Sequence, residues 1–313
     1  MSDCYDLDPT DRQWPAESEP WSRLRPLHWV WRLITDQIEV TSVDLPVRRL
    51  PSEFYGLVAC QASDFHVDSE ADLHRLQQAV RIINGHSPDL VFLTGDYFSD
   101  CKSMWRYIGE FRQALGELKP PLGVFAIAGN HDHSLSFWTI AQALRNSGAC
   151  VLANENHSLE LKGSRLFIVG VDDLWSDRAR PSYAFRGVQP DDCTILLVHN
   201  PDAAPYVRHL KPGVMLSGHT HGGLIRIPVY GSPVRSFLRI GRQFYSGLNR
   251  YKDFYIYTNR GLGAFPLSLR INCRPEVSLF KLTGWPRDMQ IEKSRAARVE
   301  ATGLRIRSSP LLT

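Results

Sequence analysis

Short apolar runs that alternate with amphipathic helical patterns constrain the fold of this chain more than any other feature of its sequence. Each run has the length and composition of a buried strand, and the runs cover residues 54–60, 90–94 and 124–128. Between them, apolar residues repeat at helical spacing, first from Ser69 to Gly85 and then over residues 103–118. A strand–helix–strand–helix–strand order predicts a layered α/β architecture.

In the second half of the chain the pattern changes to shorter expected strands. They cover residues 159–161, 166–171, 194–198, 214–216, 254–257 and 277–282. No internal repeat or low-complexity linker interrupts the sequence, so one domain over residues 38–283 is the economical interpretation. A hydrophobic content of 43% in 313 residues is enough for one large core.

Both ends of the chain are expected to lie outside this domain. Residues 1–20 form an acidic tail that we expect to be disordered, and residues 284–313 form a basic tail that we expect to be largely disordered. Residues 21–37 form an amphipathic segment that begins with the run WSRLRPLHWVWRLI. Its mixture of tryptophan and arginine suits a membrane interface, and a short helix packed on the domain is the alternative.

The overall charge and the apolar runs exclude several classes of protein. A formal net charge of +3 is too small for binding polyanions by bulk charge, and no basic–aromatic nucleic-acid module is present. The acidic N-terminus lacks the basic start of a secretory signal, and no run approaches the roughly 20 apolar residues of a membrane span. We therefore expect a cytoplasmic protein without a nucleic-acid partner, soluble or peripheral on the inner face of the cytoplasmic membrane.

Side chains that can bind metals follow the expected strands at five places. They are Asp64 and His66, Asp96, Asn130, His199, and the pair His219 and His221. Because ligands of α/β sheets gather beyond the carboxyl ends of strands, we expect these side chains to meet. Alternation along a strand would turn both members of each pair toward one face. Imidazole with carboxylate suits two divalent cations, with Mn²⁺ favoured and Fe or Zn as alternatives.

The order of these motifs resembles the calcineurin-like metallophosphoesterase superfamily over nearly all of residues 38–283. The most specific motifs are Gly-Asn-His-Asp at 129–132 and Gly-His-Thr-His-Gly-Gly at 218–223. An Ile-Leu-Leu-Val-His-Asn-Pro-Asp run at 195–202 and an Arg-x-x-Cys-x-Pro-Glu segment at 270–276 are similar to the bacterial branch of YkuE and YaeI. The resemblance implies a four-layer α-β-β-α sandwich of two packed mixed sheets flanked by helices.

The resemblance also implies a role for each of these side chains. One metal ion would be held by Asp64, His66, Asp96 and His221, and the other by Asp96, Asn130, His199 and His219. Asp96 would bridge the two ions. His131 would face the substrate as general acid or charge stabiliser, and Asp132 would orient His131. Such a site hydrolyses phosphoesters, because paired cations activate water and neutralise phosphoryl charge.

A basic and aromatic stretch over residues 224–250 indicates the class of substrate. It contains no acidic residue, and its candidate substrate-binding residues are Arg226, Arg235 and Arg239. Arginine suits phosphate through paired hydrogen bonds, and the apolar side chains between the arginines could receive an acyl chain. We expect a phosphorylated amphiphilic small molecule, and a cationic surface loop with its aromatic residues in the core is the alternative.

Within the superfamily, an amphiphilic phosphate points to UDP-2,3-diacylglucosamine, an intermediate of lipid A biosynthesis, as the lead substrate of a pyrophosphatase. A phosphodiesterase that acts on nucleotide or glycerophospho substrates is the alternative enzyme. A non-catalytic membrane-surface binding protein with this fold is the alternative of another class. Such a protein would be expected to lack metal ligands, and none of the expected ligands is missing.

Overall fold

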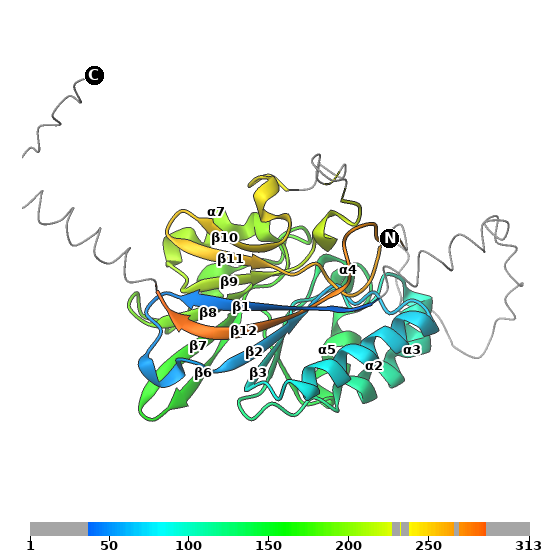
Figure 1. The fold of residues 1–313 in the computed structure, drawn as a ribbon, viewed down its shortest axis with the longest axis horizontal. Coiled ribbons are helices and arrows are strands. Elements are labelled where there is room, and N and C mark those ends of the chain that lie inside the picture. Colours follow the sequence, from blue (N-terminus) through cyan, green and yellow to red (C-terminus); the bar gives the residue numbers. More distant parts are fainter. Residues whose placement is uncertain (1–36, 227–231, 233–237, 266–268, 286–313) are drawn as a thin grey trace, which may run out of the picture.

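The computed structural model describes residues 37–226, 232, 238–265 and 269–285. Two six-stranded sheets pack face to face, and helices lie on their outer faces (Figure 1). Both sheets contain parallel and antiparallel pairs of strands. The expected fold of two packed mixed sheets flanked by helices is therefore confirmed.

The first sheet has the strand order β1-β12-β2-β3-β4-β5. Its strands are β1 (Glu39–Val47), β12 (Glu276–Gly284), β2 (Val58–Ala62), β3 (Leu90–Leu93), β4 (Val124–Ala126) and β5 (Ala149–Val151). Strands β2 to β5 are parallel, whereas β12 runs antiparallel to β2 and parallel to β1. The last strand of the domain thus pairs with its first two strands and ties the two ends of the domain together.

The second sheet has the strand order β10-β11-β9-β8-β7-β6. Its strands are β10 (Gly247–Tyr251), β11 (Phe254–Thr258), β9 (Val214–Ser217), β8 (Cys193–Leu197), β7 (Ser164–Gly170) and β6 (Glu155–Leu161). The four central strands are parallel, and an antiparallel hairpin closes each edge. Parallel central strands place their carboxyl ends at one edge of the sheet, where ligands bind in α/β proteins.

The apolar residues form three layers of core. Large side chains such as Phe92 and Phe125 fill the space between the two sheets. The outer face of the first sheet packs against α2 (Glu70–Gly85), α3 (Cys101–Leu115) and α5 (Phe137–Asn146). The outer face of the second sheet packs against shorter elements, among them α6 (Pro181–Ala184) and α7 (Ala204–Val207). Along β8, Ile195 belongs to the inner layer and Leu196 to the outer one, as alternation along a strand requires.

The boundaries agree with the expected elements to within a few residues. The helix expected at Ser69 begins directly after it, because the Ser69 hydroxyl accepts a hydrogen bond from the Asp72 amide and caps α2. Helix α3 begins at Cys101, two residues before the expected 103, because Asp100 caps it. The sequence did not predict strands β1, β5 and β10, nor helices α4 (Asn130–Ser134), α5, α6 and α7.

Several predictions concern residues that lie outside the described part of the chain. These are the acidic tail at 1–20, all but Gln37 of the amphipathic segment at 21–37, Arg235, and all but Gly284 and Trp285 of the basic tail at 284–313. Among the described residues, no helix combines the length and the apolar character that crossing a membrane requires.

Candidate metal centre

Five loops that follow parallel strands bring the expected ligands together. The loops follow β2, β3 and β4 of the first sheet and β8 and β9 of the second. Three groups of side chains offer ligand atoms within 4.8 Å of one another. These groups are Asp64 with His66 and His221, His66 with Asp96 and His131, and Asp96 with His199 and His219. The remaining expected ligand, Asn130, lies against the third group, with its Oδ1 atom 2.9 Å from His219 Nδ1.

Asp96 lies where the groups meet. Its Oδ2 atom is 3.0 Å from His199 Nε2 and 3.8 Å from His66 Nε2, so one carboxylate faces histidines of two groups. Asp64 is fully buried, with Oδ1 3.5 Å from His221 Nε2. The ligand groups thus adjoin at the Asp96 carboxylate, the side chain that the resemblance implies as a bridging ligand.

Five of the seven expected ligands have a left-handed backbone. The φ angles are 48° at Asp64, 43° at His66, 57° at Asp96, 71° at His219 and 49° at His221. Such angles are unfavourable for residues with a side chain and cluster at functional sites. The predicted reason for the pairing of residues i and i+2 was therefore wrong. Strands β2 and β9 end at Ala62 and Ser217, and the ligands lie on tight turns beyond them, where strand alternation no longer applies.

Two glycines allow these turns to approach each other. A Cβ atom at Gly129 would lie 2.2 Å from Asp96 Oδ1, and one at Gly218 would lie 2.3 Å from Asp64 Oδ2. Neither distance is compatible with a non-bonded contact. The glycines of Gly-Asn-His-Asp and Gly-His-Thr-His-Gly-Gly are thus required because the backbone passes directly against a ligand carboxylate.

The histidines are oriented by bonds to their second ring nitrogen. His66 Nδ1 lies 2.6 Å from the Ser99 hydroxyl, and His199 Nδ1 lies 2.6 Å from the Thr94 carbonyl. The Nε2 atoms of His66 and His199 are buried and have no hydrogen-bond partner, although His199 Nε2 is close to Asp96. A buried imidazole nitrogen without a partner is costly, and a bound cation would satisfy it. The residues present therefore fit a pair of divalent metal ions.

Burial and charge separate the pKa values of the histidines. Burial lowers the pKa of His66, His219 and His221 to about 3 each, so these imidazoles are neutral and ready to ligate. Burial also opposes the charged form of His199, but the Asp96 carboxylate outweighs it and raises the pKa of His199 to about 10. Without a bound cation, the Asp96 carboxylate thus favours the protonated form of His199.

The sequence predicted that Asp132 orients His131, but in the structure the Asp132 carboxylate binds backbone amides instead. Its carboxylate accepts hydrogen bonds from the backbone amides of Asp96 (2.9 Å), Tyr97 (2.9 Å) and Gly129 (2.7 Å). Asp132 is fully buried, and burial together with the Asp96 charge raises its pKa. The side chain instead fixes the loop that carries Asp96, and thus positions a ligand from 36 residues away in the sequence.

His131 lies at the edge of the site. It is half-buried, and its backbone amide donates a 2.9 Å hydrogen bond to Asp96 Oδ1. Its ring stands 5.0 Å from the ring of His66 and 4.6 Å from that of Phe265, nearly perpendicular to both. One ring nitrogen of His131 also lies within 4.8 Å of ligand atoms of His66 and Asp96.

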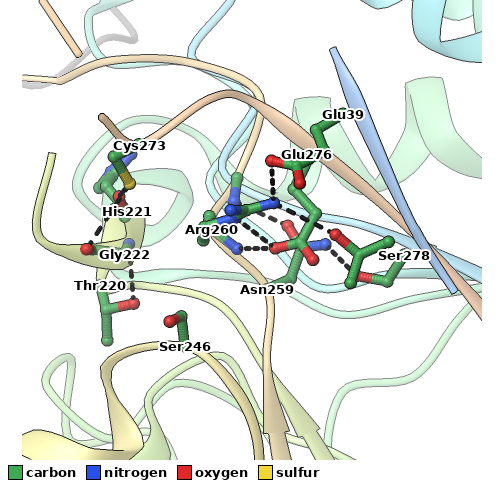
Figure 2. A network of polar contacts seen from close by, with 12 residues as sticks. Glu39, Thr220, His221, Gly222, Ser246, Asn259, Arg260, Cys273, Glu276 and Ser278 are labelled. Carbon is green, nitrogen blue, oxygen red and sulfur yellow. Dashed lines mark hydrogen bonds and ion pairs between the residues drawn. The ribbon is translucent and has the colours of Figure 1, made fainter. Parts of the chain in front are cut away.

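The segment that precedes β12 supports the loop of His219 and His221. Figure 2 shows Cys273 next to His221, whose carbonyl accepts a 3.3 Å hydrogen bond from the Cys273 thiol. Figure 2 also shows Arg260 between Glu276 and Glu39, with both ion pairs at 3.0 Å. Buried Arg270 donates to the backbone carbonyl of His221 and to that of Gly261, which lies on the segment after β11.

Three aromatic or basic side chains at the site were not predicted to belong to it. The ring of Phe265 stacks on that of His66 at 5.2 Å, and the Trp175 ring stands 4.3 Å from the His219 ring. Arg270 was noted only as part of a family motif. No pattern in the sequence identifies the positions of Phe265 and Trp175, because each contact joins segments far apart in the chain.

Two of the candidate substrate arginines, Arg226 and Arg239, belong to the described residues. Arg226 donates to the Gly222 carbonyl at 3.0 Å and to the Ser246 hydroxyl, so its guanidinium supports the loop after His221. Arg239 lines a groove of about 540 Å³ together with Tyr206, Arg250 and other residues, next to the loop that follows His199. Its backbone amide is bonded to the Asp202 carboxylate at 2.8 Å.

Comparison with known proteins supplies the family. A family model described as calcineurin-like phosphoesterase matches residues 59–223. The chain is 32% identical to the phosphodiesterase YaeI of Escherichia coli over 223 residues, covering 70% of this chain and 80% of YaeI. It is 33% identical to the metallophosphoesterase YkuE of Bacillus subtilis over 249 residues, covering 78% of this chain and 85% of YkuE.

A third relative has a named substrate. The chain is 25% identical to the UDP-2,3-diacylglucosamine pyrophosphatase LpxG of Chlamydia muridarum over 313 residues, covering 82% of this chain and 93% of LpxG. The matched family segment contains the five loops that carry the expected ligands. The chain therefore belongs to the calcineurin-like phosphoesterase family, a family of metal-dependent phosphoester hydrolases.

Proposed function

We propose that the chain is a binuclear metallohydrolase of phosphodiester or pyrophosphate bonds. One ion would be held by Asp64, His66, Asp96 and His221, and the other by Asp96, Asn130, His199 and His219. The observation that carries this proposal is the Asp96 carboxylate, which faces histidines of two ligand groups. Mn²⁺ suits these imidazole and carboxylate donors best, with Fe or Zn as alternatives.

The side chains divide the work of hydrolysis. Divalent cations, when bound, supply positive charge to the phosphoryl group and lower the pKa of water. The buried imidazoles and carboxylates hold fixed charge in a site that excludes bulk water, where it stabilises the transition state most. His131, half-buried at the edge, would protonate the leaving oxygen or stabilise its charge. Asp132 keeps the Asp96 loop in place throughout.

The lead substrate is UDP-2,3-diacylglucosamine. Support comes from the relative LpxG, which aligns with 82% of this chain and is named for hydrolysis of that compound. The groove beside Arg239 adds support, because it combines cationic side chains with Tyr206, Phe244 and Tyr251. Such a surface suits an anionic amphiphile, since guanidinium groups bind phosphate and aromatic rings contact apolar chains.

A second candidate is a phosphodiesterase that acts on nucleotide or glycerophospho substrates. The relative YaeI, which is 32% identical, is named a phosphodiesterase and favours this alternative. Both candidates use the same metal centre and the same in-line attack on phosphorus. They differ in whether acyl chains contribute to binding.

An acylated substrate also implies attachment to a membrane surface. We propose peripheral binding to the inner face of the cytoplasmic membrane, because cations near an anionic surface contribute roughly 1 kcal/mol each. The Arg239 groove supports this proposal through Arg250 and Lys252, which line it as well. Salt should weaken such binding, since exposed charges are screened within about 10 Å at 0.1 M salt.

A substrate panel tests the proposal. Purified protein loaded with Mn²⁺ is incubated with UDP-2,3-diacylglucosamine, cyclic nucleotides and bis-p-nitrophenyl phosphate, and kcat/KM is measured for each. We expect the highest value for UDP-2,3-diacylglucosamine, with UMP as one product. Turnover of the small diesters alone would favour the phosphodiesterase, and no turnover of any substrate would contradict both.

Charge reversal separates the lipid surface from the metal centre. Arg235→Glu with Arg239→Glu should weaken binding to anionic vesicles at low salt and slow the acylated substrate more than bis-p-nitrophenyl phosphate. The matched control reverses exposed Arg81 and Arg112, which lie on α2 and α3. Equal slowing of both substrates, or no vesicle binding by the unaltered protein, would remove the lipid proposal.

A further inference from the structure

A large aromatic side chain stands exposed at the edge of the metal centre. Trp175 lies on the loop between β7 and α6, and its ring centroid is 4.3 Å from that of His219, with the planes at 85°. The side chain nevertheless remains 52% exposed. An indole that touches an expected ligand and also faces solvent leaves apolar surface for a molecule that enters the site.

The loop that carries Trp175 is held in place by bonds on both sides. Asp172 Oδ1 lies 2.5 Å from His133 Nε2, which joins the loop to the helix that begins at Asn130. Asn154 Oδ1 accepts hydrogen bonds from the backbone amides of Asp172 (3.2 Å) and Arg180 (2.7 Å).

Within the loop, the buried Asp173 adds further bonds. Its carboxylate accepts from the Ser176 amide at 2.6 Å, and its carbonyl accepts from the amide of Arg178 at 3.1 Å. A loop with this many backbone bonds holds its shape. The exposure of Trp175 is therefore a fixed feature of the site.

A polar cleft opens on the loop that carries Trp175, and Ser176, the next residue, lines it. It has a volume of about 390 Å³ and is lined by Asn154, Asp172, Ser176, Asp177, Arg178 and Arg180. Every one of these side chains is polar or charged. An acyl chain is unfavourable there, because it would take these groups out of water without replacing their hydrogen bonds. The exposed guanidinium groups of Arg178 and Arg180 lie beside the carboxylates of Asp172 and Asp177. This mixture of donors and acceptors suits a ligand with hydroxyl and phosphate oxygens.

We propose that Trp175 stacks against the nucleobase of a nucleotide ester. A planar base needs an aromatic platform, and its sugar and phosphates need polar surroundings, which the loop provides together. The inference rests on the proposed hydrolase function and deepens it by naming the part of the substrate that this side of the site recognises. Acyl groups, where a substrate has them, bind elsewhere.

Two esters with the same leaving group test the inference. Thymidine 5′-p-nitrophenyl phosphate and methyl p-nitrophenyl phosphate both release p-nitrophenol, and they differ in the nucleoside. Stacking of one base on an aromatic side chain corresponds to about 5- to 150-fold in binding. Trp175→Ala should therefore lower kcat/KM for the thymidine ester about 10-fold or more, with less than a 2-fold change for the methyl ester.

Matched variants separate stacking from general damage. Trp175→Phe keeps an aromatic face and should retain most of the preference for the thymidine ester. Trp138→Ala removes a tryptophan that is 67% exposed on α5 and should change neither rate. Equal effects of Trp175→Ala on both esters, or no effect on either, would overturn the inference.

A binding measurement covers the case in which neither ester is hydrolysed. Absence of turnover would contradict the proposed function, whereas the stacking inference would still be tested by titrating Mn²⁺-loaded protein with thymidine 5′-monophosphate and with inorganic phosphate. Trp175→Ala should weaken the nucleotide about 10-fold or more and leave phosphate unchanged. Equal affinity of the variant and the unaltered protein for the nucleotide would overturn the inference by itself.

Discussion

The buried carboxylate of Asp132 accepts a 2.9 Å hydrogen bond from the backbone amide of Asp96, the residue whose side chain faces two groups of candidate ligands. Asp132 accepts two further backbone amides and does not itself belong to any of the ligand groups. The position of Asp96 is thus fixed by a side chain that lies outside the candidate ligand groups. This relationship makes the loops after β3 and β4 act as one unit.

Asp132→Asn should lower both stability and metal affinity. An amide has one acceptor oxygen, so at least one of the three backbone amides loses its partner, at a cost of about 1–3 kcal/mol. We expect a lower Tm and weaker Mn²⁺ binding by calorimetry. The control is Asp100→Asn, which should leave both nearly unchanged because asparagine caps a helix as well as aspartate. Unchanged Mn²⁺ affinity in Asp132→Asn would show that Asp96 needs no such support.

His131→Ala should keep the metals and lose turnover. A general acid contributes about 10²- to 10⁴-fold to the rate, so kcat should fall by that factor. His219→Ala, by contrast, should lose bound metal as well. Metal content by elemental analysis, measured beside kcat, distinguishes the two roles. His131 also lies within ligand distance of His66 and Asp96, so metal loss in His131→Ala would assign it as a ligand.

Gly129→Ala should disrupt the centre through a single methyl group. The added Cβ would lie 2.2 Å from Asp96 Oδ1, and Asp96 would have to move. We expect loss of Mn²⁺ binding and of activity. Gly109→Ala is the matched control, because its Cβ would meet nothing within 4 Å on helix α3 and should stabilise the fold by about 0.5–1 kcal/mol. Normal metal content in Gly129→Ala would contradict the tight approach of these loops.

In the metal-free protein, the free energy of unfolding should depend on pH through His219. Burial, followed by the His199 charge, lowers the pKa of His219 from 6.5 to about 3. As the pH falls, His219 is therefore protonated in the unfolded state before it is protonated in the folded state. The stability that neutral His219 allows is present above pH 6.5 and is lost as the pH falls toward 3. Urea unfolding in EDTA should show wild type losing stability relative to His219→Asn by up to about 1.4 kcal/mol per pH unit in that window. A difference in the free energy of unfolding that stays constant over this pH window would contradict the lowered pKa of His219.

The expected ligands could be predicted from the sequence because each belongs to a short local motif. Each ligand motif directly follows a short apolar run, and parallel strands must end at the same edge of a sheet. The left-handed angles of Asp64 and His66 could not be predicted in this way, since they arise from packing of the loop against its neighbours. The strand β1 was missed because it is half-exposed over most of its length and lacks a continuous apolar run.

Contacts between distant segments were beyond the sequence patterns. Asp132 was expected to act on its neighbour His131, but its partners include Asp96 and Tyr97 on another loop. The contact of Trp175 with His219 likewise joins loops that follow β7 and β9. Tertiary packing determines which side chains position or extend a site. Such side chains do not occur at a regular spacing in the sequence, so no sequence pattern predicts them.

The most direct test of a binuclear metal site is the metal stoichiometry of Asp96→Asn compared with the unaltered protein. Chelated protein is titrated with Mn²⁺, and bound metal and hydrolysis of bis-p-nitrophenyl phosphate are measured in the same samples. We predict two ions per chain and activity that rises as they bind. Asp96→Asn should lose both ions and activity, because that carboxylate faces both ligand groups. Full activity in the metal-free protein, or two tightly bound ions in Asp96→Asn, would contradict a binuclear site that shares Asp96.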